Sequence, residues 1–198
     1  MFDLGPAARE MTRLVQGVGD DQLAAPTPCP AYVLGDLLEH VHGLALAFRM
    51  AADKQIPEGG GSNPPGDARR LPEDWRGATA ERLEALVTAW TNEDAWQGTT
   101  HIAGFDAPAD NVAVTALNEL VVHGWDVAVA SGQTLELDDV TVQACLGFAE
   151  ILSGPGGDAM RGTAFGPVVA IPPDAAPLDR ILGANGRDPR WGTGRATR

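Results

Sequence analysis

The sequence predicts an all-α protein, a four-helix bundle with an extra helix and a short extended segment near the C-terminus. Apolar residues recur at spacings of three and four in several stretches, which is the periodicity of an amphipathic helix. These stretches are roughly 14 to 20 residues long, as the helices of bundles are. Strand-like patterning is short and confined to the last ~40 residues, which do not suffice for a sheet-based core.

The first two expected helices cover about residues 3–18 and 34–52. Each has one apolar stripe, formed by Leu4, Ala8, Met11, Leu14, Val15 and Val18 in the first and by Leu34, Leu37, Leu38, Val41, Leu44, Ala45 and Phe48 in the second. The segment between them contains three prolines at alternate positions, Pro26, Pro28 and Pro30. Proline removes backbone donors and favours extended neighbours, so this segment is not helical.

A long irregular segment separates the second helix from the third. It runs from Lys54 to about Gly77 and contains three consecutive glycines and two consecutive prolines. Connections of this length inside a compact domain are usually functional or disordered. The third helix is expected over about Thr79 to Asp94.

Two further helices follow, at about Asp110 to Ala130 and Asp139 to Leu152. Asp110 is the expected N-cap of the fourth helix, and Gly132 comes directly after its end, where glycine commonly terminates a helix. These residues complete the set of long helices that the bundle needs.

The last part of the chain has a different character. Residues 164–171 read as a short extended piece, residues 177–182 as a short helix, and the tail from Arg187 is basic and glycine-rich. We therefore expect a helical bundle over residues 1–155. Residues 156–198 are expected to form a C-terminal extension that packs on the bundle and ends in a frayed tail.

Composition and charge exclude several classes of function. The 198 residues include 14 Lys and Arg against 27 Asp and Glu, a formal net charge of -13. Such a charge repels nucleic-acid phosphates and anionic lipids, so neither nucleic acid nor a membrane is expected as a partner. The two cysteines, Cys29 and Cys145, are too few for a disulfide framework or a cysteine zinc site. With no signal-peptide pattern and no run of ~20 apolar residues, we expect a cytoplasmic protein.

The four histidines are the first candidates for chemistry. His40 and His42 project about 200° apart on a helix, so one straight helix cannot direct both at a single ion. His40 lies at a border of the apolar stripe, where a histidine is commonly a satisfied core residue. His101 lies in a loop-like stretch and is expected to be solvated. Cys29, between two prolines, is a reactive-thiol candidate, but an inert buried cysteine is the favoured interpretation.

The fourth helix carries an unusual row of polar residues. Glu119 and His123 are one turn apart at a border of its apolar face, and Asp126 continues the row. A carboxylate and an imidazole so spaced can bind one divalent ion, and a third ligand from another helix would complete a site with open positions. Asp126 could then orient an imidazole. The plain alternative is an ordinary surface pair, since Glu–His pairs at this spacing are common.

Three stretches together resemble one family: TPCPAYVLGDLLEHVHG, NELVVHGWDVAVASGQ and AFGPVVAIPPDAAPLDRILGANGRDP. They are similar to the DinB-like superfamily, in the branch of mycothiol-dependent maleylpyruvate isomerase N-terminal domains, over nearly the whole chain and in the same order. The resemblance implies an up-down-down-up four-helix bundle with a long crossover. It also implies a divalent-metal site formed by His40, Glu119 and His123.

The chain departs from this family at several positions. Tyr32-Val33 stands where the family usually has Trp-Thr, and Val33 cannot cap the second helix, a loss of typically ~1 kcal/mol. Asn118 stands before Glu119 where the family often has an aspartate. The chain does not extend over the isomerase's further domain, and the helix with Glu119 carries no arginine, so maleylpyruvate isomerisation is not expected.

These observations support an enzyme hypothesis and two alternatives. In the enzyme hypothesis, the metal activates a low-molecular-weight thiol, which the resemblance implies is mycothiol, and the thiol attacks a small electrophile in a transferase or isomerase-like reaction. Metal-dependent hydrolysis is the second choice among enzymes. The crossover and Trp125 would shape the pocket. Zinc is the preferred metal, with nickel, iron and manganese also suited. The alternatives are a non-catalytic protein with a structural or sensory metal and a helical interaction module without metal. A homodimer is a further expectation.

Overall fold

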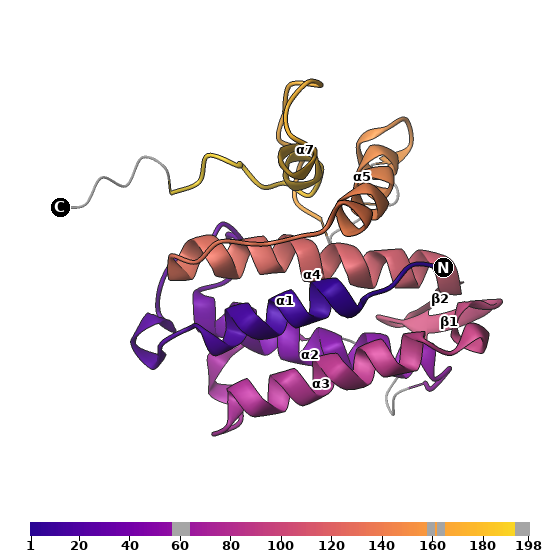
Figure 1. Ribbon diagram of the computed structural model, residues 1–198, viewed down its shortest axis with the longest axis horizontal. Coiled ribbons are helices and arrows are strands. Elements are labelled where there is room, and N and C mark those ends of the chain that lie inside the picture. The colour runs from indigo at the N-terminus through magenta and orange to yellow at the C-terminus, as the bar shows by residue number, and fades with distance from the viewer. Residues whose placement is uncertain (57–63, 158–160, 162–164, 193–198) are drawn as a thin grey trace. The chain divides into compact units, whose positions relative to one another are not determined.

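A computed structural model describes residues 1–56, 64–157, 161 and 165–192, and it divides into two compact units, Met1–Leu137 and Asp138–Arg198. The described residues form six α-helices and one two-stranded sheet (Figure 1), which confirms the all-α prediction. The helices are α1 Gly5–Gln16, α2 Leu34–Ala52, α3 Trp75–Trp90, α4 Ala109–Ser131, α5 Asp139–Ser153 and α7 Pro177–Ala184.

The first unit is a four-helix bundle in which α1 and α2 each contact both α3 and α4 (Figure 1). The predicted bounds of α2 agree with the structure, and those of α1 are two residues too long at each end. The core is made by the apolar stripes that the sequence shows. Leu14, Leu34, Leu37 and Leu117 are wholly buried there.

Side-chain contacts between the helices establish their directions. The imidazole of His42, midway along α2, contacts the hydroxyl of Thr79 near the start of α3. Farther along both helices, the indole of Trp90 donates to the carbonyl of Phe48, so these two helices are parallel. Arg76, at the start of α3, donates to the carbonyl of Val18 beyond the end of α1. Helices α1 and α3 are therefore antiparallel.

The fourth helix completes the order. On α2 and α4, His40 packs against His123, whereas Ala45 and Ala116 line one cavity farther along, so these helices are antiparallel. With α2 and α3 parallel, the directions are up, down, down, up, as the resemblance implied. Helix α4 is long and apolar enough to cross a membrane by length and composition, but 78% of the relevant window is buried inside the structure, as in the core helix of a bundle.

The crossover between α2 and α3 is shorter than expected because α3 begins earlier. The carboxylate of Asp74 accepts the backbone N–H of Gly77, which caps the helix and places Trp75 in its first turn, 5% exposed. The helix ends at Trp90, four residues before the predicted end. The crossover contains a single 3-10 turn, Ala68–Arg70, and its residues 57–63 lie outside the described part of the chain.

A β-hairpin lies between α3 and α4 where the sequence predicted only a loop. Its strands are β1, Thr99–Ile102, and β2, Phe105–Pro108, joined by a two-residue turn. Both turn residues, Ala103 and Gly104, have positive φ (52° and 89°). Such a turn is usually signalled by Asn-Gly or Asp-Gly, and alanine at the first position conceals it.

The ends of α4 agree with the prediction only in part. The helix begins at Ala109 after Pro108 and has no side-chain cap, so the prediction that Asp110 is the N-cap is wrong. Asp110 instead accepts the N–H of Asn111, its neighbour. At the other end, Gly132 has φ 77°, the left-handed conformation expected of a terminating glycine.

In the second unit, α5 contacts α7, whereas the sequence placed α5 with the bundle and the boundary near residue 155. The buried guanidinium of Arg161 donates to the carbonyls of Leu152 and Ala184, the last turns of these two helices. Cations are stabilised at helix C-termini. The residues of 165–171 form no strand, and Arg187 is 8% exposed, so any frayed tail begins after it. Residues 193–198 lie outside the described part.

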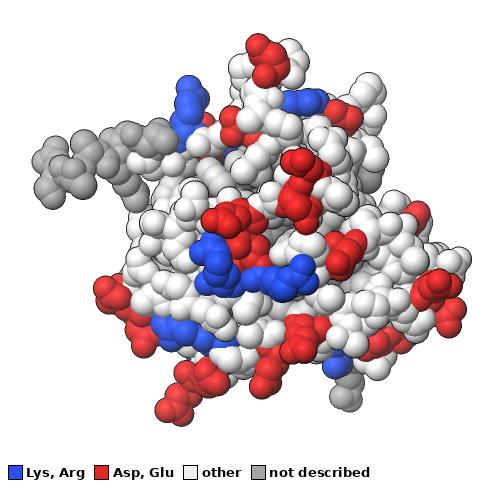
Figure 2. Space-filling view, in the orientation of Figure 1, with Lys and Arg blue, Asp and Glu red and all other residues white. Residues whose placement is uncertain are grey.

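The surface agrees with the strongly negative net charge. Asp and Glu side chains are scattered over the face shown in Figure 2, and the Lys and Arg side chains drawn there lie singly or in small groups beside them. Among the described residues, several arginines are paired with carboxylates, as in Arg70 with Glu39 and Arg76 with Asp20.

Candidate metal centre

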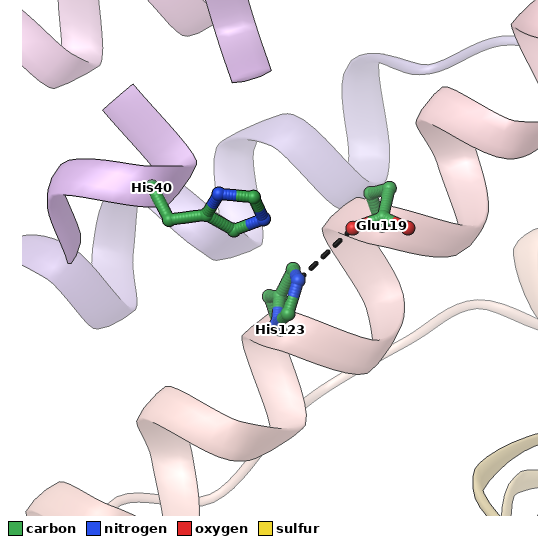
Figure 3. A group of neighbouring side chains, drawn as sticks. All are labelled: His40, Glu119 and His123. Atoms are coloured by element: carbon green, nitrogen blue, oxygen red, sulfur yellow. Dashed lines mark ion pairs between the residues drawn. The ribbon is translucent and has the colours of Figure 1, made fainter. Parts of the chain in front are cut away.

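Three side chains from two helices converge on one point of the bundle. His40 of α2 and Glu119 and His123 of α4 each offer a ligand atom, and these atoms all lie within 4.8 Å of one another (Figure 3). Nε2 of His123 lies 2.9 Å from a carboxylate oxygen of Glu119. The rings of His40 and His123 are perpendicular, with centroids 5.2 Å apart.

The helices themselves produce this arrangement. Glu119 and His123 are four residues apart, so they project from the same face of α4, one turn above the other. Because α2 runs antiparallel to α4 in direct contact, it brings His40 to the same level, and Figure 3 shows its imidazole extending from α2 toward the pair. Residues about 80 positions apart in the chain thus form one cluster.

His123 is held by carboxylates on both of its nitrogens. Nδ1 lies 3.0 Å from a carboxylate oxygen of Asp126, a side chain that is fully buried. Burial by itself would lower the pKa of His123, but the hydrogen bonds to Asp126 and Glu119 outweigh it and raise the pKa to about 9. Its position between two carboxylates therefore favours the charged form of the imidazole when no metal is bound.

The donor set fits a divalent metal. A tetrahedral ion with bonds of about 2.0–2.2 Å to nitrogen and oxygen holds its ligand atoms about 3.3–3.6 Å apart, so side-chain rotations that bring these atoms closer by up to about 1.5 Å would complete the site. With Nδ1–H of His123 donating to Asp126, the lone pair on Nε2 is directed to the side where Glu119 lies. A metal would take the place of the proton shared there.

The other residues that the sequence offered as candidates for chemistry lie outside the cluster. His42 is buried and contacts Thr79 at 3.1 Å, on the side of α2 that faces α3, as the opposed projection of His40 and His42 predicted. His101 is not simply solvated: its side chain is 16% exposed and pairs with Asp106 across the hairpin at 2.9 Å. Trp125 is buried and lies about 200° around α4 from His123. Its place in a substrate pocket stays a prediction.

In the sequence, Tyr32 stands out only as a departure from the family pattern. Its ring packs on the imidazole of His40, with centroids 5.1 Å apart and planes inclined by 35°. Burial raises the pKa of its hydroxyl, and the backbone N–H of Gly66, which belongs to the crossover, opposes that rise. The sequence carries no signal for these contacts, because they join a turn to a residue far along the chain.

A small cavity adjoins the cluster inside the bundle. Its volume is about 10 Å³, about enough for one water molecule. Glu119 forms part of its wall, and the other lining residues are apolar: Met11, Val41, Leu44, Ala45, Phe48, Leu86, Ala116 and Leu120.

Comparisons with known proteins agree with this fold. Two uncharacterised proteins of Mycobacterium tuberculosis, from strains CDC 1551 / Oshkosh and ATCC 25618 / H37Rv, are each 26% identical over 181 residues, which cover 89% of this chain and 91% of theirs. A crystal structure of the mycothiol-dependent maleylpyruvate isomerase superposes with a TM-score of 0.58 at 17% identity, over 74% of this chain and 66% of that one. A mutant of that isomerase gives a TM-score of 0.54 at 18% identity.

A family model decides the affiliation. The model of the mycothiol maleylpyruvate isomerase N-terminal domain matches residues 4–128. This range covers the four bundle helices except for the last turn of α4, and it includes His40, Glu119 and His123. On that match, and on the up-down-down-up bundle that the structure shows, this chain belongs to the mycothiol maleylpyruvate isomerase N-terminal domain family.

Proposed function

We propose that this protein binds a divalent metal through His40, Glu119 and His123 and uses it to bring a small thiol to an electrophile. The observation that carries this proposal is the convergence of the three ligand atoms within 4.8 Å. Two imidazoles and one carboxylate suit zinc, while nickel, iron and manganese accept the same donors. Three protein ligands leave coordination positions for another molecule.

Each residue of the cluster has a defined task in this proposal. His40 and Glu119 hold the metal from facing helices. Asp126 fixes the tautomer of His123 by accepting a hydrogen bond from its Nδ1–H. A bound divalent metal would supply one piece of chemistry, the lowering of the pKa of a coordinated thiol. The family affiliation supports mycothiol as that thiol and a transferase or isomerase-like reaction.

The first experiment measures metal binding. Protein prepared without a histidine tag is analysed for metal content and titrated with Zn²⁺, beside His123→Ala and the matched control His101→Ala. We expect one metal per chain in the wild type and in His101→Ala. Because even residues that only orient ligands affect affinity by about 10–100-fold, loss of a ligand in His123→Ala should weaken binding at least that much. Equal affinities in all three proteins would refute the metal site.

The second experiment tests the use of the metal. Conjugation of a model electrophile is followed with and without mycothiol, in the metal-loaded and metal-free protein. A rate that requires both the thiol and the metal, and that is lost in His123→Ala but kept in His101→Ala, supports the proposed reaction. A metal-loaded protein without any thiol-dependent rate supports the alternative below.

A non-catalytic metal is the second candidate function. It is favoured by the small cavity, about 10 Å³, that adjoins Glu119, and by the burial of His123, whose side chain is 7% exposed. In that case the metal would stabilise the contact between α2 and α4, and its removal should lower the melting temperature. A melting temperature that does not change when His123→Ala abolishes binding would contradict a purely structural metal.

A further inference from the structure

We propose that Tyr32 is a positioning residue of the metal centre: its ring orients the His40 imidazole, and its hydroxyl ties that imidazole to the crossover. This inference rests on the metal-binding function proposed above. It assigns a role to a residue outside the ligand set, on a turn that precedes α2. Three independent sets of contacts support it.

The first is the ring contact. The Tyr32 ring lies 5.1 Å from the His40 ring, centroid to centroid, and the perpendicular ring of His123 lies 5.2 Å from the same imidazole. A histidine side chain has two rotatable bonds, and its ring must be turned correctly for a nitrogen to reach a metal. Packing by Tyr32 restricts this rotation before any metal binds.

The second is the rigid attachment of Tyr32 itself. The backbone N–H of Tyr32 donates to the carbonyl of Cys29, and the hydroxyl of Thr27 donates to the carbonyl of Tyr32 at 2.8 Å. An isolated bridge between Pro26 and Val33 closes the same turn. The tyrosine therefore projects from a closed turn and not from a free loop.

The third is the close approach of the crossover. The backbone N–H of Gly66 acts on the Tyr32 hydroxyl, where it opposes the rise in pKa that burial causes, and a Cβ at Gly66 would overlap the carbonyl oxygen of Asp36 and lie 3.1 Å from Cβ of His40. Only glycine allows this approach. The next residue, Asp67, donates its N–H to Glu39, beside His40 on α2. Tyr32 thus lies between the crossover and a metal ligand, in contact with both.

Tyr32→Leu, Tyr32→Phe and Phe105→Ala separate these contributions. Leucine keeps apolar bulk but removes the flat ring, phenylalanine keeps the ring but removes the hydroxyl, and Phe105 is an exposed hairpin aromatic outside the cluster. Each protein is titrated with Co²⁺, whose visible absorption reports ligand geometry. Tyr32→Leu should bind about tenfold more weakly, as residues that orient ligands do, with a changed spectrum. Tyr32→Phe should restore the affinity to within about twofold of the wild type, and Phe105→Ala should match the wild type.

The hydroxyl is tested by limited digestion with trypsin, which cuts after arginine. Arg69 and Arg70 lie in the crossover a few residues after Gly66. In Tyr32→Phe the crossover loses a tie, so cleavage at these arginines should be faster than in the wild type, while metal affinity is kept. Equal cleavage rates would overturn the assigned role of the hydroxyl.

Gly66→Ala perturbs the same contacts from the crossover, and it replaces Tyr32→Leu as the test if that variant does not fold. The added methyl group would overlap the Asp36 carbonyl and press on Cβ of His40, so the crossover or this part of α2 must shift, and weaker Co²⁺ binding with a changed spectrum is expected. Gly147→Ala is the control, since a Cβ there meets no atom within 4 Å. If wild-type protein binds no Co²⁺, the metal function itself fails and the role of Tyr32 with it. If the wild type binds and the Tyr32 and Gly66 variants match their controls, only the positioning role fails.

Discussion

The bond between His123 and Asp126 is the most buried polar contact of the candidate centre. Asp126 is fully buried, and its carboxylate lies 3.0 Å from Nδ1 of the imidazole. In asparagine the side-chain oxygen can still accept this hydrogen bond, but the negative charge that strengthens the imidazole as a ligand is gone. The residue thus influences the metal without touching it.

We expect Asp126→Asn to weaken Zn²⁺ binding by about 10–100-fold, the usual effect of removing such a partner, with the helical content retained. Competition with a chromophoric chelator measures the affinity. Asp110→Asn, on the exposed first turn of the same helix, is the control and should bind as the wild type does. An unchanged affinity in Asp126→Asn would show that the carboxylate has no influence on the site.

Single residues also show where sequence reasoning succeeds and where it stops. The pair Glu119 and His123 was visible because helical spacing places them on one face, and the family resemblance added His40. The contact of Tyr32 with His40 and Gly66 was not visible, because it depends on a turn and a crossover whose paths no local pattern encodes.

At the scale of elements, a buried polar contact joins the parallel helices α2 and α3. Nδ1 of His42 lies 3.1 Å from the hydroxyl of Thr79, a residue 1% exposed. Replacing Thr79 by valine preserves shape but leaves the imidazole without this partner in a dry interior. An unsatisfied buried polar group costs about 1–3 kcal/mol.

Thr79→Val should therefore lower the free energy of unfolding by about 1–3 kcal/mol, measured by urea denaturation. Thr88→Val is the control on the same helix, because its hydroxyl lies on the exposed side and bonds only to the preceding turn. The control should change stability by less than about 0.5 kcal/mol, as surface substitutions do. Equal losses in both variants would mean that the buried contact contributes nothing specific.

A second tie joins α1 to the segment that follows α4. The carboxylate of Glu10 accepts bonds from the guanidinium of Arg13 and, at 2.7 Å, from the backbone N–H of Glu136. Burial tends to raise the pKa of Glu10, but these hydrogen bonds outweigh it and hold the pKa below its usual value. The charged form is thus favoured by folding, and its contribution is present above about pH 4.5 and is lost as the pH falls through the lowered pKa.

Glu10→Gln should lower the free energy of unfolding near neutral pH by about 1.5–3 kcal/mol, the range for hydrogen bonds to a charged group. The difference from the wild type should shrink as the pH is lowered below about 4.5, because the wild type then loses the same charge. Denaturation curves at pH 7 and pH 3.5 test this, with the exposed Glu81→Gln as control. A difference that does not depend on pH would refute the role of the carboxylate charge.

The elements themselves were predictable to different degrees. Helix α2 was placed correctly because its apolar stripe is long and regular. The start of α3 was missed because Asp74 and Trp75 precede any clear periodicity, and the hairpin was missed because Ala103 stands where asparagine would signal the turn. Helix caps and tight turns depend on single residues, so a sequence pattern identifies them less well than it identifies the periodicity of a whole helix.

At the scale of the whole molecule, the ligands and the bundle core lie in one of the two compact units. Met1–Leu137 contains α1 to α4, the hairpin and all residues of the candidate centre, whereas α5 and α7 contact each other in Asp138–Arg198. The family model likewise matches only residues 4–128. A unit of this size with its own apolar core is large enough to fold by itself.

We therefore expect a chain truncated after Leu137 to unfold in one cooperative transition and to bind Zn²⁺ within about threefold of the full-length affinity, since all its ligands are retained. Circular dichroism on heating and the chelator competition measure these two properties, with His123→Ala in the truncated chain as the non-binding control. A truncated chain that folds but binds much more weakly would show that residues after Leu137 act on the centre. One that does not fold would contradict the independence of the first unit.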